Sequence, residues 1–246
     1  MTIYRTLRPG FGCIGQLTPR RISPSFSTPR SVLYTTMAAE RGPARRMQNT
    51  AIFVCDIQEK FRNAIYGFDN VVLTATKVLK AAKLLSIPIY VTTQNRARLG
   101  DTIPELRAHL PTSLVREDVD KTLFSMWTPA ISRHFPRPGP SGPCSTIVIV
   151  GIESHICVTQ TALDCLAAGH RVYVLADGVS SCNREEVAVA LARLRAEGAV
   201  VATSEGWLYE RLGDAAAPEF RGAVALVKES AADTRAALQG LLASKM

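Results

Sequence analysis

The sequence lacks several features that would place it in a simpler class of protein. Its 246 residues contain no apolar run of the 18 or so residues that a membrane-spanning helix requires. Its six cysteines form no C-x-x-C pair and have no zinc-like spacing. No apolar stretch near the amino terminus is long enough for a secretory signal. We therefore predict a soluble protein with reduced thiols and no membrane partner.

Acidic residues are almost absent from the first 50 residues. This segment has eight arginines, no lysine and one acid, Glu40, and so contributes +7 to the net charge of +8. A composition rich in arginine and serine and poor in acids is typical of a mitochondrial transit peptide. We predict a disordered leader over residues 1–48. If this leader is genuine and cleaved, the protein is expected in mitochondria. If it is not, or if translation starts at Met37 or Met47, a cytoplasmic location is expected.

The remainder of the chain, residues 51–246, is almost neutral at +1. Proteins that bind nucleic acids present a basic face. We therefore expect no nucleic-acid partner for this part of the chain. RNA binding or cleavage driven by the arginines of the leader is a separate hypothesis.

From residue 50 onward, apolar runs that are typical of buried strands alternate with segments of helical spacing. Strands are expected over 50–55, 87–92, 113–115, 147–150, 171–176 and 199–203. Helices are expected over 69–86, 159–168, 184–197, 205–212 and 235–242. Asp69 or Asn70 is the expected N-cap of the first helix, and Asp177-Gly178 the expected turn after the fifth strand.

This alternation predicts an α/β fold. The expected architecture has three layers, α/β/α, around a mostly parallel central sheet of about six strands. We place this domain at residues 49–230 and a C-terminal helix in 231–246.

Three residues with useful chemistry lie at the ends of predicted apolar segments. Asp56 ends the first strand, Lys121 lies at the boundary of an apolar segment, and Cys157 opens a helix after the strand that stops at Gly151. The beginning of a helix favours a thiolate. Ligands of parallel α/β sheets bind at the carboxyl ends of the strands, so a carboxylate, an amine and a thiol could meet there. Taken singly, Asp56 could be a helix or turn cap and Lys121 a solvated loop residue.

Three segments around these residues resemble the motifs of a known family, in the same order along the chain. They are Asp56-Ile-Gln-Glu-Lys-Phe61, Lys121-Thr-Leu-Phe-Ser125 and Gly151-Ile-Glu-Ser-His-Ile-Cys157. They resemble the isochorismatase-like cysteine hydrolases, which have a Rossmann-type fold. The resemblance covers about residues 50–230 and is greatest to the isochorismatase-domain-containing branch.

The resemblance implies a catalytic triad. Cys157 would be the nucleophile, Asp56 its proton acceptor, and Lys121 the cation that positions the aspartate. A cis peptide bond is implied between Ile152 and Glu153, and the N–H groups of Glu153 and Cys157 would then stabilise an oxyanion.

Four further residues are candidates for the wall of a small substrate pocket: Phe61, Phe124, Trp127 and His155. His155 lies two residues before Cys157, but positions this close on one turn rarely give a Cys-His dyad. We therefore expect His155 to be a pocket or structural residue.

Two departures from the family narrow the prediction. Metal-binding relatives such as the nicotinamidases carry aspartate and histidine after the second strand, whereas residues 92–100 contain neither. We thus expect no metal, no other cofactor and no activity on nicotinamide. Hydrolases that act on isochorismate lack the cysteine, so Cys157 argues against that substrate as well.

The sequence therefore predicts a metal-independent cysteine hydrolase that cleaves a C–N bond in a small amide or ureide. The resemblance also implies a homo-oligomer. The alternative is a catalytically silent scaffold that keeps the triad and acts through protein contacts.

Overall fold

The computed structural model describes residues 47–139 and 142–242. The predicted leader lies outside these ranges except for its last two residues, of which Met47 is buried in the core. Within the described ranges, no helix is both long and apolar enough to cross a bilayer.

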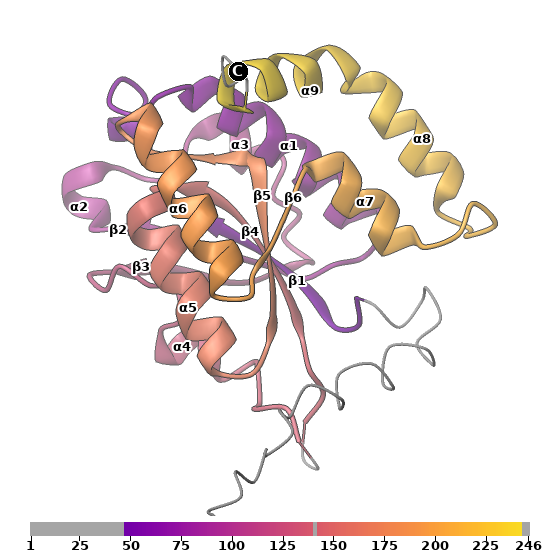
Figure 1. The fold of residues 1–246 in the computed structure, drawn as a ribbon, viewed down its shortest axis with the longest axis horizontal. Helices are drawn as coiled ribbons and strands as arrows, with labels where there is room; N and C mark the ends of the chain where they lie inside the picture. Colours follow the sequence, from indigo (N-terminus) through magenta and orange to yellow (C-terminus); the bar gives the residue numbers. More distant parts are fainter. Residues whose placement is uncertain (1–46, 140–141, 243–246) are drawn as a thin grey trace, which may run out of the picture. The chain divides into compact units, whose positions relative to one another are not determined.

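A parallel sheet forms the centre of the described domain (Figure 1). Its strands are β1 (Thr50–Cys55), β2 (Ile89–Gln94), β3 (Val115–Lys121), β4 (Thr146–Ile152), β5 (Arg171–Ser180) and β6 (Val200–Ala202). They are arranged in the order β3-β2-β1-β4-β5-β6, and each neighbouring pair is parallel. β1 and β4 are buried along their whole length, as expected for central strands that are covered on both faces.

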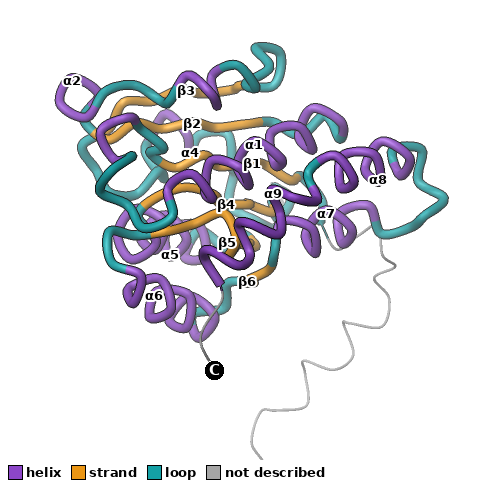
Figure 2. Tube along the Cα trace, turned by 90° about the horizontal axis from the view of Figure 1, so that it is seen from above, coloured by secondary structure: helices purple, strands orange, loops and turns teal. Residues whose placement is uncertain are grey.

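Helices cover both faces of the sheet (Figure 2). One face carries α1 (Phe68–Leu84), α7 (Ser204–Leu212), α8 (Phe220–Glu229) and α9 (Ala231–Ala237), and the other carries α4 (Pro129–Ser132), α5 (Thr159–Ala167) and α6 (Arg184–Ala196). Shorter elements are η2 (Glu59–Phe61), α2 (Arg96–Leu99), α3 (Pro104–Arg107), and the π-helical turns η3 (Ser154–Val158) and η4 (Leu238–Leu242). The predicted three-layer α/β/α fold is confirmed.

Two hydrophobic clusters, one on each side of the sheet, form the core. Ile52 and Val54 of β1 belong to the cluster under α1, whereas Phe53 and Cys55 belong to the cluster under α5. Successive side chains of a strand point to opposite faces, so one apolar run supplies both clusters. Cys55 thereby faces the same layer as Cys157.

Two local predictions were wrong. Helix α1 begins at Phe68, and Gly67, not Asp69 or Asn70, occupies the N-cap position with a φ of 61°. Residues Asp177 and Gly178 form no turn, because β5 continues through them to Ser180. The Asp177 carboxylate is buried and accepts hydrogen bonds from the backbone N–H and the hydroxyl of Ser204, at 2.7 and 2.6 Å, so it fixes the beginning of α7.

Strand β3 is longer and later than the predicted strand at 113–115. Its alternate residues Arg116, Asp118 and Asp120 are exposed and charged, and such a strand is compatible with the edge of a sheet. Because β3 extends to Lys121, the ammonium group lies at the carboxyl end of the sheet. Neither helix α8 nor helix α2 was predicted.

Candidate active site

The strand order places the candidate site where the sheet topology reverses. From β1 the chain adds β2 and β3 on one side, while β4, β5 and β6 lie on the other side. A crevice at the carboxyl ends of strands forms at such a switch point. Asp56 directly follows β1, the segment that leads to Cys157 follows β4, and Lys121 is the last residue of β3. Three segments far apart in sequence thus end at one edge.

Asp56 and Lys121 form a buried, fully hydrogen-bonded ion pair. The Lys121 Nζ lies 2.7 Å from Asp56 Oδ2, and the two side chains are 1% and 2% exposed. The other carboxylate oxygen accepts a hydrogen bond of 2.7 Å from the Thr92 hydroxyl. Lys121 also donates to Gln94 Oε1 at 2.8 Å, and to the backbone carbonyls of Leu123 and Phe124 at 3.1 and 3.0 Å. Such a set of partners offsets the cost of burying both charges.

Two thiols lie beside this ion pair. Cys55 and Cys157 are both buried, and the Cys55 thiol is within hydrogen-bonding reach of Cys157 and 3.7 Å from Asp56 Oδ2. Burial, the contact with Cys157 and the Asp56 charge all raise the pKa of Cys55 well above its ordinary value. Cys55 therefore stays protonated and can act as a hydrogen-bond donor.

The charge of Lys121 acts on both sulfur atoms as well as on the carboxylate. Burial opposes the ammonium form, but the interactions with Cys55, Asp56 and Cys157 outweigh it, so that the pKa of Lys121 is raised. Lys121 thus remains cationic and pairs with the Asp56 carboxylate. The structure brings Asp56, Lys121 and Cys157 together in one buried group.

The turn that carries Cys157 is tightly packed. Gly151 has a φ of +123°, and a Cβ at this position would lie 2.1 Å from the carbonyl oxygen of Cys55. Only glycine fits here. The Ile152–Glu153 peptide bond is cis, and η3 then continues directly into α5. The Thr161 hydroxyl donates to the Cys157 carbonyl at 2.6 Å, which ties the turn to the helix.

The predicted wall residues lie apart from one another. Phe61 packs against the cluster under α1, and Trp127 packs against the cluster under α5, where it contacts His170 at a ring distance of 5.4 Å. Phe124 is 51% exposed and Leu123 is 56% exposed, and both lie just after β3, the strand that ends at Lys121. Lys121 therefore has an apolar, solvent-exposed loop beside it.

His155 Nδ1 lies 2.9 Å from the Ser181 hydroxyl, in the loop that follows β5. Together with Glu153 and Cys182 it forms a group of possible metal ligands. This group is separate from residues 92–100 at the end of β2, which contain neither histidine nor aspartate.

Sequence reasoning missed the residues that support the triad. Thr92 and Gln94 sit at the end of β2, between Asp56 and Lys121, and each bonds one of them. Their place at the end of a predicted strand was the available signal. Gln58 is buried and bonds the backbone of Gln94 and Gly100, so it braces the β2–α2 segment.

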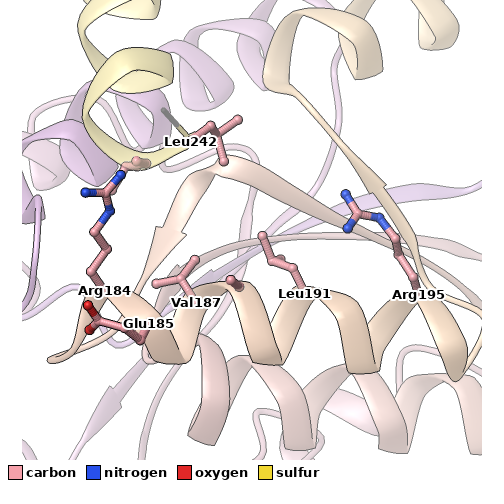
Figure 3. A pocket seen from close by; sticks show the side chains of 8 residues that line it. Arg184, Glu185, Val187, Leu191, Arg195 and Leu242 are labelled. Atoms are coloured by element: carbon pink, nitrogen blue, oxygen red, sulfur yellow. The ribbon is translucent and has the colours of Figure 1, made fainter. Parts of the chain in front are cut away.

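A pocket of about 470 Å³ lies elsewhere, between α6 and η4 (Figure 3). Arg184 and Arg195 flank its apolar floor, which includes Val187 and Leu191. None of the triad residues lines this pocket.

A three-layer parallel α/β/α domain with a carboxylate, a lysine and a thiol at its switch point defines a hydrolase scaffold. Comparison with known proteins specifies it further. Residues 50–206 match the isochorismatase domain, and the chain belongs to the isochorismatase family.

Similar proteins cover most of the chain. The secreted isochorismatase effector Isc1 of Phytophthora sojae (strain P6497) is 36% identical over 198 residues, covering 78% of this chain and 93% of Isc1. Isochorismatase domain-containing protein 2 of Homo sapiens is 38% identical over 201 residues, covering 80% of this chain and 93% of that protein. The solved structure of the MAR1 ribonuclease of Caenorhabditis elegans is 34% identical with a TM-score of 0.70, covering 84% of this chain and 98% of that one.

Proposed function

We propose that this protein is a cysteine hydrolase that cleaves a C–N bond in a small amide or ureide without a catalytic metal. The observation that carries the proposal is the buried Asp56–Lys121 ion pair, beside which the buried Cys157 thiol lies. A buried ion pair adds little net stability compared with apolar residues of the same size. Its presence at the switch point therefore favours a chemical role.

The proposed reaction begins with proton transfer from the Cys157 thiol to the Asp56 carboxylate. The thiolate then attacks the substrate carbonyl, forming an S–C bond and a tetrahedral oxyanion. When this intermediate collapses, the C–N bond breaks, and Asp56 returns the proton to the departing nitrogen. An amine leaves, and a thioester remains on Cys157.

Water completes the cycle. Asp56 accepts a proton from a water molecule, and the hydroxide attacks the thioester. The C–S bond then breaks, the acid leaves, and Asp56 returns the proton to the sulfur of Cys157. Lys121 stays protonated throughout and balances the charge of the carboxylate. We assign the oxyanion to the N–H groups of Glu153 and Cys157, close to the beginning of α5.

The burial of the group supports a small substrate. Asp56, Lys121 and Cys157 are all buried, and the exposed neighbours on the lysine side are Leu123 and Phe124. We infer that a compact molecule with an apolar portion enters along this loop, with Phe124, Phe61, Trp127 and His155 still predicted as pocket residues. A homo-oligomeric state and a mitochondrial or cytoplasmic location also remain predictions.

The test is an activity screen over small amides and ureides with the full chain and two cysteine variants. Cys157→Ala should lower turnover by at least about a thousandfold, because the nucleophile is lost. Cys165→Ala is the matched control, since Cys165 is also a buried thiol of the same hydrophobic cluster but has no hydrogen bond or ion pair with Asp56 or Lys121. Intact mass should detect a thioester adduct on the wild type and none on Cys157→Ala. Amidase activity that survives Cys157→Ala would overturn the proposal.

One relative suggests a second candidate function. The 34% identical structure from Caenorhabditis elegans bears the name ribonuclease, so RNA should be included as a substrate in the same screen. Cleavage of RNA by the wild type that is lost in Cys157→Ala would favour this function. If neither substrate class is turned over and iodoacetamide does not label Cys157, the silent-scaffold alternative would be supported.

A further inference from the structure

Three side chains beside the Cys157 turn combine the donor types of a zinc site. Glu153 and His155 lie on the turn itself, and Cys182 lies in the loop between β5 and α6. One donor atom from each lies within 4.8 Å of the other two. The carboxylate oxygen, imidazole nitrogen and thiol sulfur come from segments about 30 residues apart, so the fold itself brings them together.

The surrounding hydrogen bonds hold two of these side chains in place. Glu153 Oε2 accepts the backbone N–H of Cys182 at 2.8 Å, which fixes the carboxylate against the cysteine loop. His155 Nδ1 pairs with the Ser181 hydroxyl at 2.9 Å, and Nε2 has no hydrogen-bond partner among the described residues. Histidine ligands of metal sites usually have their second ring nitrogen anchored in this way. Cys182 is an exposed free thiol, so an ion can reach it from solvent.

The donor set selects among ions. Magnesium and calcium prefer oxygen ligands, and a set with one sulfur, one nitrogen and one oxygen does not suit them. Zinc accepts all three donors, and together with one water molecule they complete a tetrahedral shell. With a carboxylate and a thiolate as ligands, the dication is neutralised. We propose that Glu153, His155 and Cys182 bind a zinc ion.

Zinc at this position would link two segments next to the nucleophile. It would clamp the β5–α6 loop to η3, and His155 is only two residues from Cys157. The zinc binding does not rest on the proposed function.

The experiment is a cobalt titration of the full chain, since cobalt takes zinc sites and a thiolate ligand gives it a near-ultraviolet charge-transfer band. The background variant is Cys157→Ala, which removes the nucleophile as a competing ligand. We expect the band in this variant, its loss when Cys182→Ser is added, and its retention when Cys144→Ser is added. Cys144 is the matched control, because it is also an exposed free thiol but lies away from Glu153 and His155. Zinc should displace the cobalt.

Two further variants test the other ligands. His155→Gln and Glu153→Gln, in the same background, should each weaken cobalt binding by at least about tenfold. Circular dichroism checks that each variant is folded. A band that persists with Cys182→Ser, or one that disappears with Cys157→Ala alone, would overturn the metal site. Failure of the amidase screen with cobalt binding intact would instead contradict only the proposed function.

Discussion

Replacement of Lys121 by methionine tests whether the ion pair is as desolvated as its geometry indicates. Methionine keeps the length and most of the volume of the lysine stem but removes the ammonium. Asp56 would then be a buried carboxylate with one side-chain donor left, the Thr92 hydroxyl at 2.7 Å, apart from the weak Cys55 thiol. Removal of one member of a buried ion pair costs about 3–5 kcal/mol. The expected loss is a large part of the 5–15 kcal/mol that stabilises a typical domain.

The partner substitution should cost less, for a reason specific to this site. In Asp56→Asn, Lys121 retains Gln94 Oε1 and the carbonyl oxygens of Leu123 and Phe124 as acceptors. The double variant Asp56→Asn, Lys121→Met contains neither buried charge. It should therefore recover at least half of the stability that Lys121→Met alone loses.

Urea unfolding followed by tryptophan fluorescence measures all three variants, because Trp127 and Trp207 both pack in the core. The expected order of stability is wild type, Asp56→Asn, the double variant, and Lys121→Met as the least stable. A loss of about 1 kcal/mol or less for Lys121→Met is the size found for exposed pairs. That result, or a double variant less stable than Lys121→Met, would refute the reasoning.

Three other predictions concern the scaffold. Gly151→Ala should lower the free energy of unfolding by more than about 3 kcal/mol or prevent folding, because its Cβ would meet the Cys55 carbonyl oxygen at 2.1 Å. Gly198 also has a positive φ, but a Cβ there would meet no atom within 4 Å. Gly198→Ala should therefore lower the free energy of unfolding by only about 1 kcal/mol in the same urea assay. Ser204→Ala removes the 2.6 Å hydrogen bond to the Asp177 carboxylate and should lower the free energy of unfolding by about 1.5–3 kcal/mol; an unchanged urea midpoint would contradict that role. Burial lowers the pKa of His170, so the folded state keeps it neutral while the unfolded chain protonates near pH 6.5. Stability should fall as the pH drops below about 6.5, and His170→Gln should flatten this dependence; an equal slope in both proteins would argue against it.

The sequence was a good guide where one physical signal dominated. Apolar runs placed β1 and β4, and the topology rule for parallel sheets placed Asp56 and the Cys157 turn at the same edge. The length of strand β3 was underestimated because its charged, alternately exposed residues resemble those of a loop. The role of Asp177 was not predicted for a similar reason. An Asp-Gly pair usually indicates a turn, and the sequence does not show that this carboxylate accepts a hydrogen bond from Ser204.

Contacts between segments distant in sequence could not be predicted in this way. Cys55 lies in the apolar run of β1 and is buried in the core. Its contact with Cys157 depends on the register between β1 and β4, in which Cys55 pairs with Gly151. The meeting of Cys182 with Glu153 and His155 depends on where β5 ends, and β5 extends four residues beyond the predicted end at Ala176.

The position of β1 in the sheet also affects how the chain can fold during its synthesis. On the ribosome, β1, β2 and β3 emerge in succession and can pair with one another as they appear. Until β4 has been made, the second edge of β1 has no partner, and this largely apolar strand is open to pairing with other chains. Asp56 and Lys121 can meet at that stage, but Cys157 joins them only when the edge closes. Newly made chains should therefore be most prone to aggregation, and most in need of a chaperone, just before the thiol reaches its place.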